Sequence, residues 1–468
     1  MNIKNLEEIY KYNKRTKFKF HMPGNFGGEN LPYGFVKNMP FFETTEIHGM
    51  DDYHAPDGII KKAERELSTV FGSKNSIFLV NGSTSGVLAA MSYFFNEKDK
   101  VLITRDCHKS VQYGLVISGA KPIYFLNSRN REYGILLPPT YSEILHELNK
   151  DNHIKGVILT SPNYYGVGIK ELEKISDLCV SRGIKIILDE AHGSHLNFTR
   201  FKKYLGNNGN IDIVVNSFHK NLNALTQTAM VHLNSEEISV NDFRRHISLV
   251  TTSSPSYLLL SSMQYSLSRY KNKGKEILNK TEKKAKYMKD LLDKYKIMYI
   301  EGKNLRGYYL DPTKVTIMFE KSAIAQRVYK NLILFGVYPE LILDNKIVFF
   351  INSEIKIEYI RKTARLINIA IKRALICRLD EQDEKFATSI LPKSSAISPR
   401  QGFYSIKEKI PIEQSVGRVA TDIITPYPPG IPLIMPGEEI TKEIVDYVKN
   451  TSSSVHGVKN GIIEVVRE

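Results

Sequence analysis

Two residues with chemically useful side chains stand at the ends of apolar segments of the sequence. Asp189 lies near the end of the run IKIILDE, and Lys220 follows the run IDIVVNS thirty-one residues later. A lysine amine can form a Schiff base with an aldehyde, and a carboxylate can keep a ring nitrogen protonated. Because open α/β sheets bind ligands at the carboxyl ends of their strands, we expect both side chains at one site.

A turn rich in Gly and hydroxyl residues, NGSTSG at 81–86, precedes the helix-like segment SGVLAAM. The backbone N–H groups of a helix start, with the hydroxyls of Ser83, Thr84 and Ser85, can bind a phosphate. His108, in RDCHKS after the run KVLIT, adds a flat imidazole at the same edge. A lysine, a carboxylate, a phosphate site and a flat ring together are what pyridoxal phosphate requires.

Each of these signals alone has a common structural explanation. A strand-end Asp often caps a turn or helix, a single lysine usually lies at the surface, and a turn rich in hydroxyls usually caps a helix. Their occurrence together, in this order and on alternate strand-to-helix connections, favours the cofactor site.

Two other kinds of site are disfavoured. The sequence DEAH at 189–192 is also a helicase motif, but no G-x-x-x-x-G-K-[ST] phosphate loop occurs in the chain. His192 and His195 could suggest a metal, but no HExxH motif or Cys/His cluster accompanies them. We therefore expect neither a bound metal nor a nucleic-acid partner.

The segments that must position these residues alternate between helix-like and strand-like patterns from about 60 to 250. Short apolar runs predict strands of a mostly parallel sheet at 76–80, 100–104, 121–126, 156–161, 184–190 and 211–217. Helical patterns between several of them fit right-handed crossovers. Beyond them we expect a long charged helix from about 265, strands at 314–320 and 346–352, a helix near 355–378, and an exposed polar connection at 380–402.

The chain has 468 residues, more than one hydrophobic core usually serves. We predict an N-terminal arm (1–50), a large cofactor-binding domain (51–290) and a C-terminal α+β domain (291–468). The net charge of +15 is diffuse, because lysines alternate with acidic residues. Membrane-spanning runs, a secretory signal and a disulfide framework are not apparent, so we expect a cytoplasmic protein without a membrane partner.

Longer motifs carry a resemblance to a known family. They are FHMPGNFGG (20–28), EIHGMDDYHAPDGIIKKAE (46–64), LVNGSTSG (79–86), RDCHKS (105–110), SPNYYGV (161–167), LDEAHGSH (188–195), NSFHKNLNALTQTA (216–229), TTSSPSYLL (251–259) and GRVATDIITPYPPGIPLIMPGE (417–438). Over nearly its whole length the chain resembles the Orn/Lys/Arg decarboxylases, pyridoxal-phosphate enzymes of fold type I. The resemblance implies an aspartate aminotransferase-like α/β large domain with a mostly parallel sheet, and a smaller α+β C-terminal domain that includes PYPPGIP.

The resemblance also implies roles for individual residues. Lys220 would be the Schiff-base lysine, Asp189 the partner of the ring nitrogen, and His108 the group that stacks on the ring. His192 would bond the cofactor's ring oxygen or a substrate carboxylate. Contacts to the phosphate, or orienting contacts, would come from Ser83, Thr84, Ser217 and His219, and across a two-fold interface from Thr252 and Ser253, so at least a homodimer is expected.

The chain departs from the family pattern in two places. The family commonly reads PGHKGG where residues 23–28 read PGNFGG, so Asn25 replaces a usual His, which bears on the entrance or substrate end of the site. The chain also begins almost at the HMPG motif. We therefore expect the short bacterial form, without the receiver-like N-terminal domain and the decamer built through it.

The expected reaction is loss of the α-carboxyl group of a basic amino acid, a step of polyamine biosynthesis. A cationic side chain in a partly buried pocket needs an acidic partner, for which Glu413, Asp51 and Asp52 are candidates, although each could equally be a solvated or turn carboxylate. We favour arginine, giving agmatine, over lysine and ornithine, because short members of the family are often arginine decarboxylases. The alternatives are an aminotransferase, disfavoured by the C-terminal motif, and a cofactor-bound paralogue without turnover, disfavoured by the retained Lys220 and Asp189.

Overall fold

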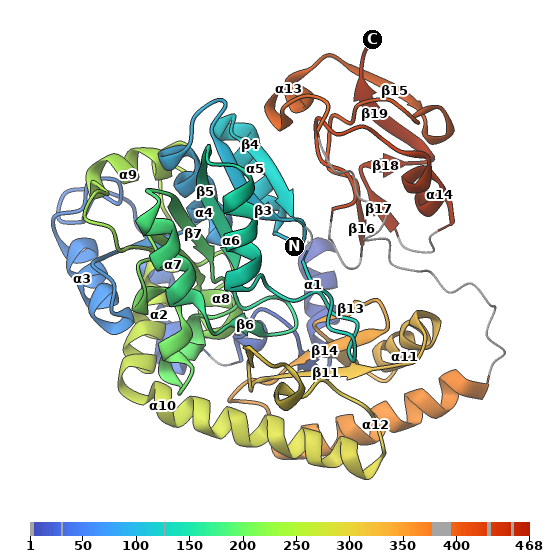
Figure 1. Ribbon diagram of the computed structural model, residues 1–468. Helices are drawn as coiled ribbons and strands as arrows, with labels where there is room; N and C mark the ends of the chain where they lie inside the picture. Colours follow the sequence, from blue (N-terminus) through green and yellow to red (C-terminus); the bar gives the residue numbers. More distant parts are fainter. Residues whose placement is uncertain (1–3, 30, 126, 377–394, 428–431, 451–453) are drawn as a thin grey trace.

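The computed structural model describes residues 4–468 apart from residues 30, 126, 377–394, 428–431 and 451–453. Figure 1 shows a large α/β unit, a second unit beneath it along a long helix, and a β-rich C-terminal unit beside it. The N-terminal part comprises α1 (Lys4–Arg15), β1 (Phe18–Phe20), α2 (Tyr33–Asn38) and α3 (Ile59–Phe71), with 3-10 turns at Phe26–Gly28 and Met39–Phe42.

The large unit is built on a seven-stranded, mostly parallel sheet, which confirms the predicted fold class. Its order is β2 (Asn75–Leu79), β9 (Ala229–Leu233), β8 (Ile213–Ser217), β7 (Lys185–Asp189), β5 (Ile154–Thr160), β3 (Lys100–Thr104) and β4 (Lys121–Phe125). All six predicted strands are present, with boundaries within two residues of those predicted. The seventh, β9, was not predicted, and it pairs antiparallel with both β2 and β8.

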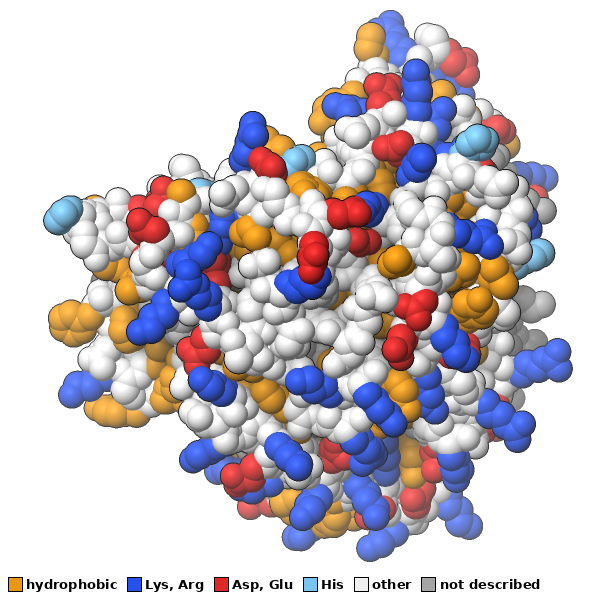
Figure 2. Space-filling model, turned by 60° about the vertical axis from the view of Figure 1, so that its left-hand side comes forward, with side chains coloured by type: hydrophobic (Ala, Val, Ile, Leu, Met, Phe, Trp, Pro, Cys, Tyr) orange, Lys and Arg blue, Asp and Glu red, His pale blue; other side chains and the backbone are white. Residues whose placement is uncertain are grey.

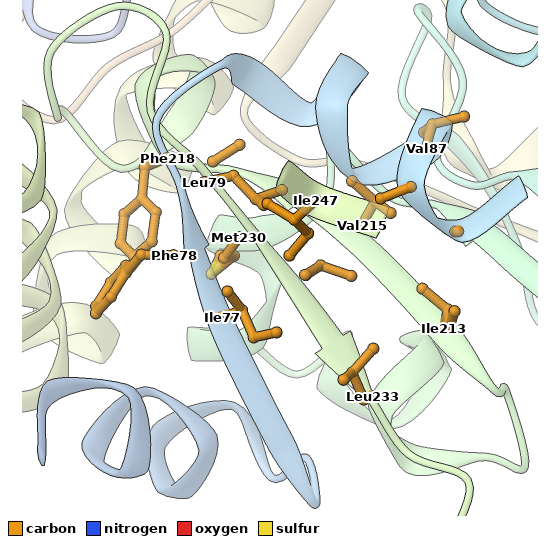
Figure 3. Close-up of a cluster of buried hydrophobic side chains, with 14 of the residues drawn as sticks. Ile77, Phe78, Leu79, Val87, Ile213, Val215, Phe218, Met230, Leu233 and Ile247 are labelled. Carbon is orange, nitrogen blue, oxygen red and sulfur yellow. The ribbon is translucent and has the colours of Figure 1, made fainter. Parts of the chain in front are cut away.

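Helices cover both faces of this sheet. One hydrophobic cluster joins α3, α4 (Gly82–Phe94), α5 (Lys109–Ser118) and α9 (Val240–Ser248) to the sheet, and Figure 3 shows part of it around Leu79, Val87 and Val215. A second cluster joins α6 (Tyr141–Lys150) and α7 (Leu172–Ser181) to the other face. Strands that are buried on both faces explain the nearly continuous apolar runs of the sequence.

A helix of 38 residues, α10 (Tyr257–Lys294), links the large unit to the second unit. It begins earlier than predicted because Ser256 caps it, accepting a hydrogen bond from Leu259 N at 3.3 Å. Its last part packs into the core of the second unit through Ala285, Met288 and Leu292. That unit contains β11 (Lys314–Met318), β14 (Lys346–Phe350) and β13 (Leu341–Leu343), with α11 (Ser322–Leu334) and α12 (Ile357–Ile376).

Short elements tie the parts together. In the second unit, β12 (Val337–Pro339) pairs in parallel with β1 of the N-terminal arm, and β10 (Tyr308–Leu310) pairs antiparallel with β6 (Val167–Ile169) of the large unit. The helix α8 (Phe218–Asn221) follows β8 directly. Further 3-10 turns lie at Ser194–Phe198, Lys202–Tyr204, Gly206–Asn208 and Gly302–Asn304.

The C-terminal unit has a hydrophobic core of its own, which includes Ile410, Ile434 and Val465. It contains α13 (Pro399–Tyr404), β15 (Lys407–Pro411), a 3-10 turn (Ile412–Gln414), β16 (Thr425–Tyr427), α14 (Lys442–Asn450), β17 (Ser454–His456), β18 (Val458–Lys459) and β19 (Ile462–Val466). The expected connection at 380–402 falls mostly outside the described residues, and its end forms the start of α13. The three predicted domain ranges stay a prediction.

The surface carries both signs of charge. On the face shown in Figure 2, Lys and Arg side chains lie over the whole surface with acidic side chains among them. No helix in the described part of the chain is long and apolar enough to cross a membrane.

Candidate active site

The predicted cofactor residues meet at the carboxyl edge of the large sheet. Asp189 is the last residue of β7, and Lys220 lies in the helix α8, which follows β8. His108 precedes α5, and Ser83 lies in the first turn of α4. Parallel strands bring these loops together because their carboxyl ends share one edge.

These residues line one pocket that encloses about 800 Å³, part of it open to solvent. Its lining includes the five predicted residues Ser83, His108, Asp189, His192 and Lys220. The remaining lining residues are Asp106, Arg129, Gly134, Leu136, Thr160, Asn163, Tyr164, Tyr165, Ala191, Leu343 and Asp344. The pocket thus combines an amine, carboxylates, imidazoles and aromatic side chains.

The amine of Lys220 lies in a desolvated position. Its Nζ is 3.0 Å from Nε2 of His192. Burial lowers the pKa of Lys220, although the carboxylates of Asp189 and Glu340 act in the opposite direction. A lowered pKa increases the fraction of the amine that is neutral, and therefore nucleophilic, near neutral pH.

His192 is buried and keeps one ring nitrogen available. Its Nδ1 has no hydrogen-bond partner among the described residues. Burial and the neighbouring Lys220 hold the pKa of His192 well below its usual value. Its ring packs edge-on against Tyr164, with the ring centres 5.2 Å apart. A neutral imidazole with a free nitrogen can therefore meet a ligand in the pocket.

His108 has a fixed ring on the wall of the pocket. It is the N-cap of α5, where its Nδ1 accepts a hydrogen bond from Ser110 N at 3.2 Å. Burial lowers the pKa of His108 to about 4, although Asp189 acts in the opposite direction. A neutral ring held in this way is suited to stacking on a flat heterocycle.

The carboxylate of Asp189 is buried at the strand end and accepts a hydrogen bond from Ala191 N at 3.1 Å. The next residue, Glu190, does not line the pocket. It accepts hydrogen bonds from Gly206 N at 3.0 Å and from Asn216 Nδ2 at 3.2 Å. Burial raises the pKa of Glu190 to about 8. Two adjacent acidic residues thus have different surroundings, one in the pocket and one inside the fold.

The hydroxyl residues at the start of α4 differ in their availability. Ser83 lines the pocket, whereas Ser85 donates a hydrogen bond to Gly82 O within the helix at 2.8 Å. Thr84 lies between them, in the same first turn. Gly82 has φ of +74°, a left-handed conformation that glycine adopts without strain.

Ser217 and His219 form a second polar group beside Lys220. Ser217 Oγ is 2.9 Å from His219 Nδ1, which also lies 3.0 Å from Thr228 O. Burial lowers the pKa of His219 to about 4. Neither residue lines the pocket described above, and Ser217 is fully buried, so their expected contact with a phosphate stays a prediction.

Thr252 and Ser253 are exposed and do not line the pocket of their own chain. The carbonyl oxygen of Thr252 lies 3.0 Å from His54 Nε2, and its Oγ1 accepts a hydrogen bond from Ser254 N at 3.1 Å. Their expected contact with a neighbouring subunit stays a prediction.

The three predicted substrate carboxylates lie outside the pocket lining. Asp51 accepts hydrogen bonds from backbone N–H groups near the start of α3, including Ile60 N at 2.7 Å. Burial acts to raise the pKa of Asp51, but these hydrogen bonds outweigh it and lower this pKa. Asp52 is exposed and accepts from His54 N at 2.7 Å, and Glu413 is exposed and pairs with Lys449 at 3.3 Å.

The unusual Asn25 is a structural residue. It is buried, its Nδ2 donates to Ala224 O at 3.0 Å, and its Oδ1 accepts from Gly27 N at 3.0 Å. It does not line the pocket described above. The side chain therefore holds the turn at 25–28 against the loop after Lys220.

Two pocket carboxylates were missed by the sequence analysis. Asp106 stands two residues before His108, so its place in RDCHKS could have indicated it. Asp344 follows β13 of the second unit, and no local pattern connects it to the strand ends of the large unit. Burial raises the pKa of both carboxyl groups, and Lys346 and Arg129 partly offset this at Asp344.

The residues present fit pyridoxal phosphate. A half-buried lysine amine, a carboxylate at the sheet edge, a neutral flat imidazole and a helix start with hydroxyls surround one pocket. The free Nδ1 of His192 adds a buried polar atom that still needs a partner. This fold and this pocket define a pyridoxal-phosphate enzyme of fold type I.

The chain belongs to the Orn/Lys/Arg decarboxylase family, which is a family of pyridoxal-phosphate enzymes. Residues 6–305 match the Orn/Lys/Arg decarboxylase major domain, and residues 382–457 match the C-terminal domain of the same family. The recognition made from the sequence motifs is thereby confirmed.

Individual relatives agree with this assignment. The arginine decarboxylase of Bacillus subtilis is 29% identical, with 98% of this chain and 96% of the relative covered. The inducible lysine decarboxylase of Escherichia coli is 25% identical, with 93% of this chain and 74% of the relative covered. Among solved structures, the Francisella novicida lysine decarboxylase has a TM-score of 0.79 at 20% identity, covering 98% of this chain and 80% of the other.

A more distant fold relative is the serine palmitoyltransferase of Sphingomonas wittichii, with a TM-score of 0.60 at 15% identity, covering 76% of this chain and 88% of the other. At such identities the similarity of structures supports the fold alone.

Proposed function

We propose that this protein removes the α-carboxyl group of L-arginine as carbon dioxide, giving agmatine, with pyridoxal phosphate attached to Lys220. The observation that carries the proposal is the meeting of Lys220, Asp189 and His192 in one pocket of a chain that belongs to a decarboxylase family. When bound, the cofactor supplies an aldehyde for amines and a ring that withdraws electrons from the breaking bond.

The surrounding residues would hold this cofactor in place. The carboxylate of Asp189 favours a proton on the ring nitrogen, and the ring of His108 covers one face. The start of α4 with Ser83 and Thr84 would bind the phosphate, with Ser217 and His219 on the other side. These fixed polar groups, in place of mobile water, would stabilise the charge that develops in the transition state.

Lys220 and His192 would then accept and donate protons during the reaction. With 3.0 Å between Lys220 Nζ and His192 Nε2, a proton can pass directly between the two nitrogens. Because burial favours the uncharged form of both groups, the amine is free to bind carbon and afterwards to carry a proton.

Arginine is proposed over lysine and ornithine because relatives named arginine decarboxylase, from several Bacillus species, are 27–29% identical over almost the full chain. The relatives named lysine decarboxylase are 22–25% identical. The substrate's cationic side chain would need a carboxylate, since an unpaired buried charge is costly. Asp344 and Asp106 line the pocket and are therefore added to Glu413, Asp51 and Asp52 as candidates for this carboxylate.

We further propose that the protein acts as a homodimer, in which Thr252 and Ser253 contact the cofactor of the other subunit. Their exposure in a single chain leaves them available for such a contact. Sedimentation of the active protein as a monomer would contradict this part of the proposal.

The reaction is tested by following carbon dioxide release from arginine, lysine and ornithine side by side. The wild type should be fastest with arginine, and Lys220→Ala should release none. Robust turnover of lysine with negligible turnover of arginine would refute the substrate, whereas keto acid without carbon dioxide would indicate an aminotransferase. A protein that binds cofactor and yields neither product would be a paralogue without turnover.

The side-chain anchor is tested with Glu413→Gln and Asp344→Asn. The variant that removes the anchor should raise KM for arginine with a smaller effect on kcat, because the contact exists in the ground state as well. A variant with the wild-type KM excludes its residue from this role.

A further inference from the structure

A buried ion pair connects the C-terminal unit to the loop that carries His108. Arg105 stands directly after β3, and Glu438 is the last residue of the segment PLIMPGE at 432–438. Their side chains are 3% and 0% exposed. The guanidinium pairs with both carboxylate oxygens, with Nη2 2.7 Å from Oε2. A bidentate pair of this kind fixes both position and orientation.

Both partners are held by further contacts. Arg105 Nη2 also donates to Leu433 O at 2.9 Å, and the guanidinium lies over the ring of Tyr124, 4.6 Å from its centre. Glu438 Oε2 accepts a second hydrogen bond, from Met435 N at 2.8 Å. The pair is therefore anchored in the β3–β4 edge of the sheet on one side and in the C-terminal unit on the other.

The loop that leaves Arg105 reaches the pocket at once. Asp106 and His108, one and three residues further on, both line it. The C-terminal unit, by contrast, contributes no lining residue in the described part of the chain, because all lining residues lie between residues 83 and 344. Any effect of this unit on the pocket of the same chain must pass through a contact such as the pair.

We propose that the Arg105–Glu438 pair positions the loop 105–108, and that the C-terminal unit thereby sets where His108 and Asp106 stand in the pocket. The proposal rests on the function proposed above. Arg105 and Glu438 are positioning residues, since neither lines the pocket. A buried arginine without its carboxylate would draw in water or turn away, and the loop attached to it would move with it.

The test compares Glu438→Gln with a control at the other end of the same strand. Lys100, the first residue of β3, pairs with Asp151 at 2.6 Å, but these side chains are 40% and 23% exposed. Asp151→Asn therefore removes an ion pair from β3 without touching the loop 105–108. The measurements are hydrogen exchange of the peptide 104–112 without cofactor, the visible circular dichroism of bound pyridoxal phosphate, and kcat and KM.

Glu438→Gln should raise exchange in the peptide 104–112, change the visible dichroism and lower kcat by about ten- to a hundredfold, because small displacements at a reacting site are costly. Asp151→Asn should leave all three at wild-type values. Wild-type exchange, dichroism and kcat in Glu438→Gln, or equal changes in both variants, would overturn the proposal.

Two further provisions keep the test decisive. If Glu438→Gln does not fold, Glu438→Asp keeps the charge on a shorter side chain and should show the same three changes in weaker form. If wild-type protein releases no carbon dioxide, the proposed function fails, but exchange and dichroism still decide whether the pair positions the loop.

Discussion

The packing of α4 on the sheet gives a sharp prediction for Gly86→Ala. Gly86 lies three residues after Ser83 in this helix and next to Leu79 of β2 and Val215 of β8. Figure 3 shows both of these side chains under α4. A Cβ atom at this position would lie 2.7 Å from Leu79 Cδ1 and 2.9 Å from Val215 Cγ1. Carbon atoms in contact prefer about 3.5–4.0 Å, so the helix or the sheet must give way by about 0.8 Å.

Two opposing terms decide the stability of this variant. Alanine is favoured over glycine in a helix by about 1 kcal/mol. Overpacking of a well-filled core costs about 1–3 kcal/mol, and here both neighbours are buried side chains in the sheet. We therefore expect a net loss of about 1 kcal/mol in the free energy of unfolding.

The same displacement should weaken cofactor binding. Ser83 and Thr84 would move with the helix, whereas Asp189 and Lys220 stay with β7 and β8. We expect the Kd for pyridoxal phosphate to rise about tenfold, equivalent to about 1.4 kcal/mol. The assays are thermal unfolding by circular dichroism and titration of the apoprotein with the cofactor.

The control is Gly34→Ala. Gly34 also lies in a helix, α2, and a Cβ atom there would meet no atom within 4 Å. It should be as stable as the wild type or slightly more so, with an unchanged Kd. If Gly86→Ala matches the wild type in both melting temperature and Kd, the argument from close packing is refuted.

Three further predictions concern carboxyl groups. Asp189→Asn should lower kcat by about 10²-fold or more, because an amide cannot favour a proton on the ring nitrogen; wild-type kcat would remove Asp189 from this role. The pKa of Glu190 is raised to about 8, so the native state holds a proton that the unfolded state loses above pH 4.5. The contribution of Glu190 to stability is therefore complete below pH 4.5 and is lost as the pH rises towards 8. Over this range the melting temperature of Glu190→Gln should fall less than that of the wild type. Asp51→Ala should reduce the free energy of unfolding by about 0.5–2 kcal/mol through loss of its hydrogen bonds to the start of α3, and an unchanged melting temperature would contradict this.

Local sequence patterns predicted six of the seven strands of the sheet and the edge at which the pocket lies. Most of the predicted strands are short runs of buried apolar residues, many of them β-branched or aromatic, and burial on both faces makes such a run nearly continuous in apolar residues. Once the sheet is parallel, its geometry brings Asp189, Lys220 and His108 to one edge. Their types and order along the chain then indicate the cofactor, and the longer motifs indicate the family.

Local patterns did not reveal β9 or the start of α10. The run at 229–233 is apolar, but its place as the strand between β2 and β8 depends in part on pairing with β2, whose residues lie 150 to 158 positions away. The start of α10 depends on the cap made by Ser256. Patterns of charge and hydropathy indicate that a helix exists more clearly than where it ends.

The far wall of the pocket, with Asp344, and the surroundings of single acidic residues were decided by tertiary structure alone. A carboxylate looks the same in the sequence whether it caps a helix, as Asp51 does, pairs on the surface, as Glu413 does, or lines the pocket, as Asp344 does. Arg105 and Glu438 are 333 residues apart, and only the packing of the C-terminal unit on the sheet brings them together. Sequence periodicity reflects burial within one element, whereas the partner of a buried charge is set by which elements pack against each other.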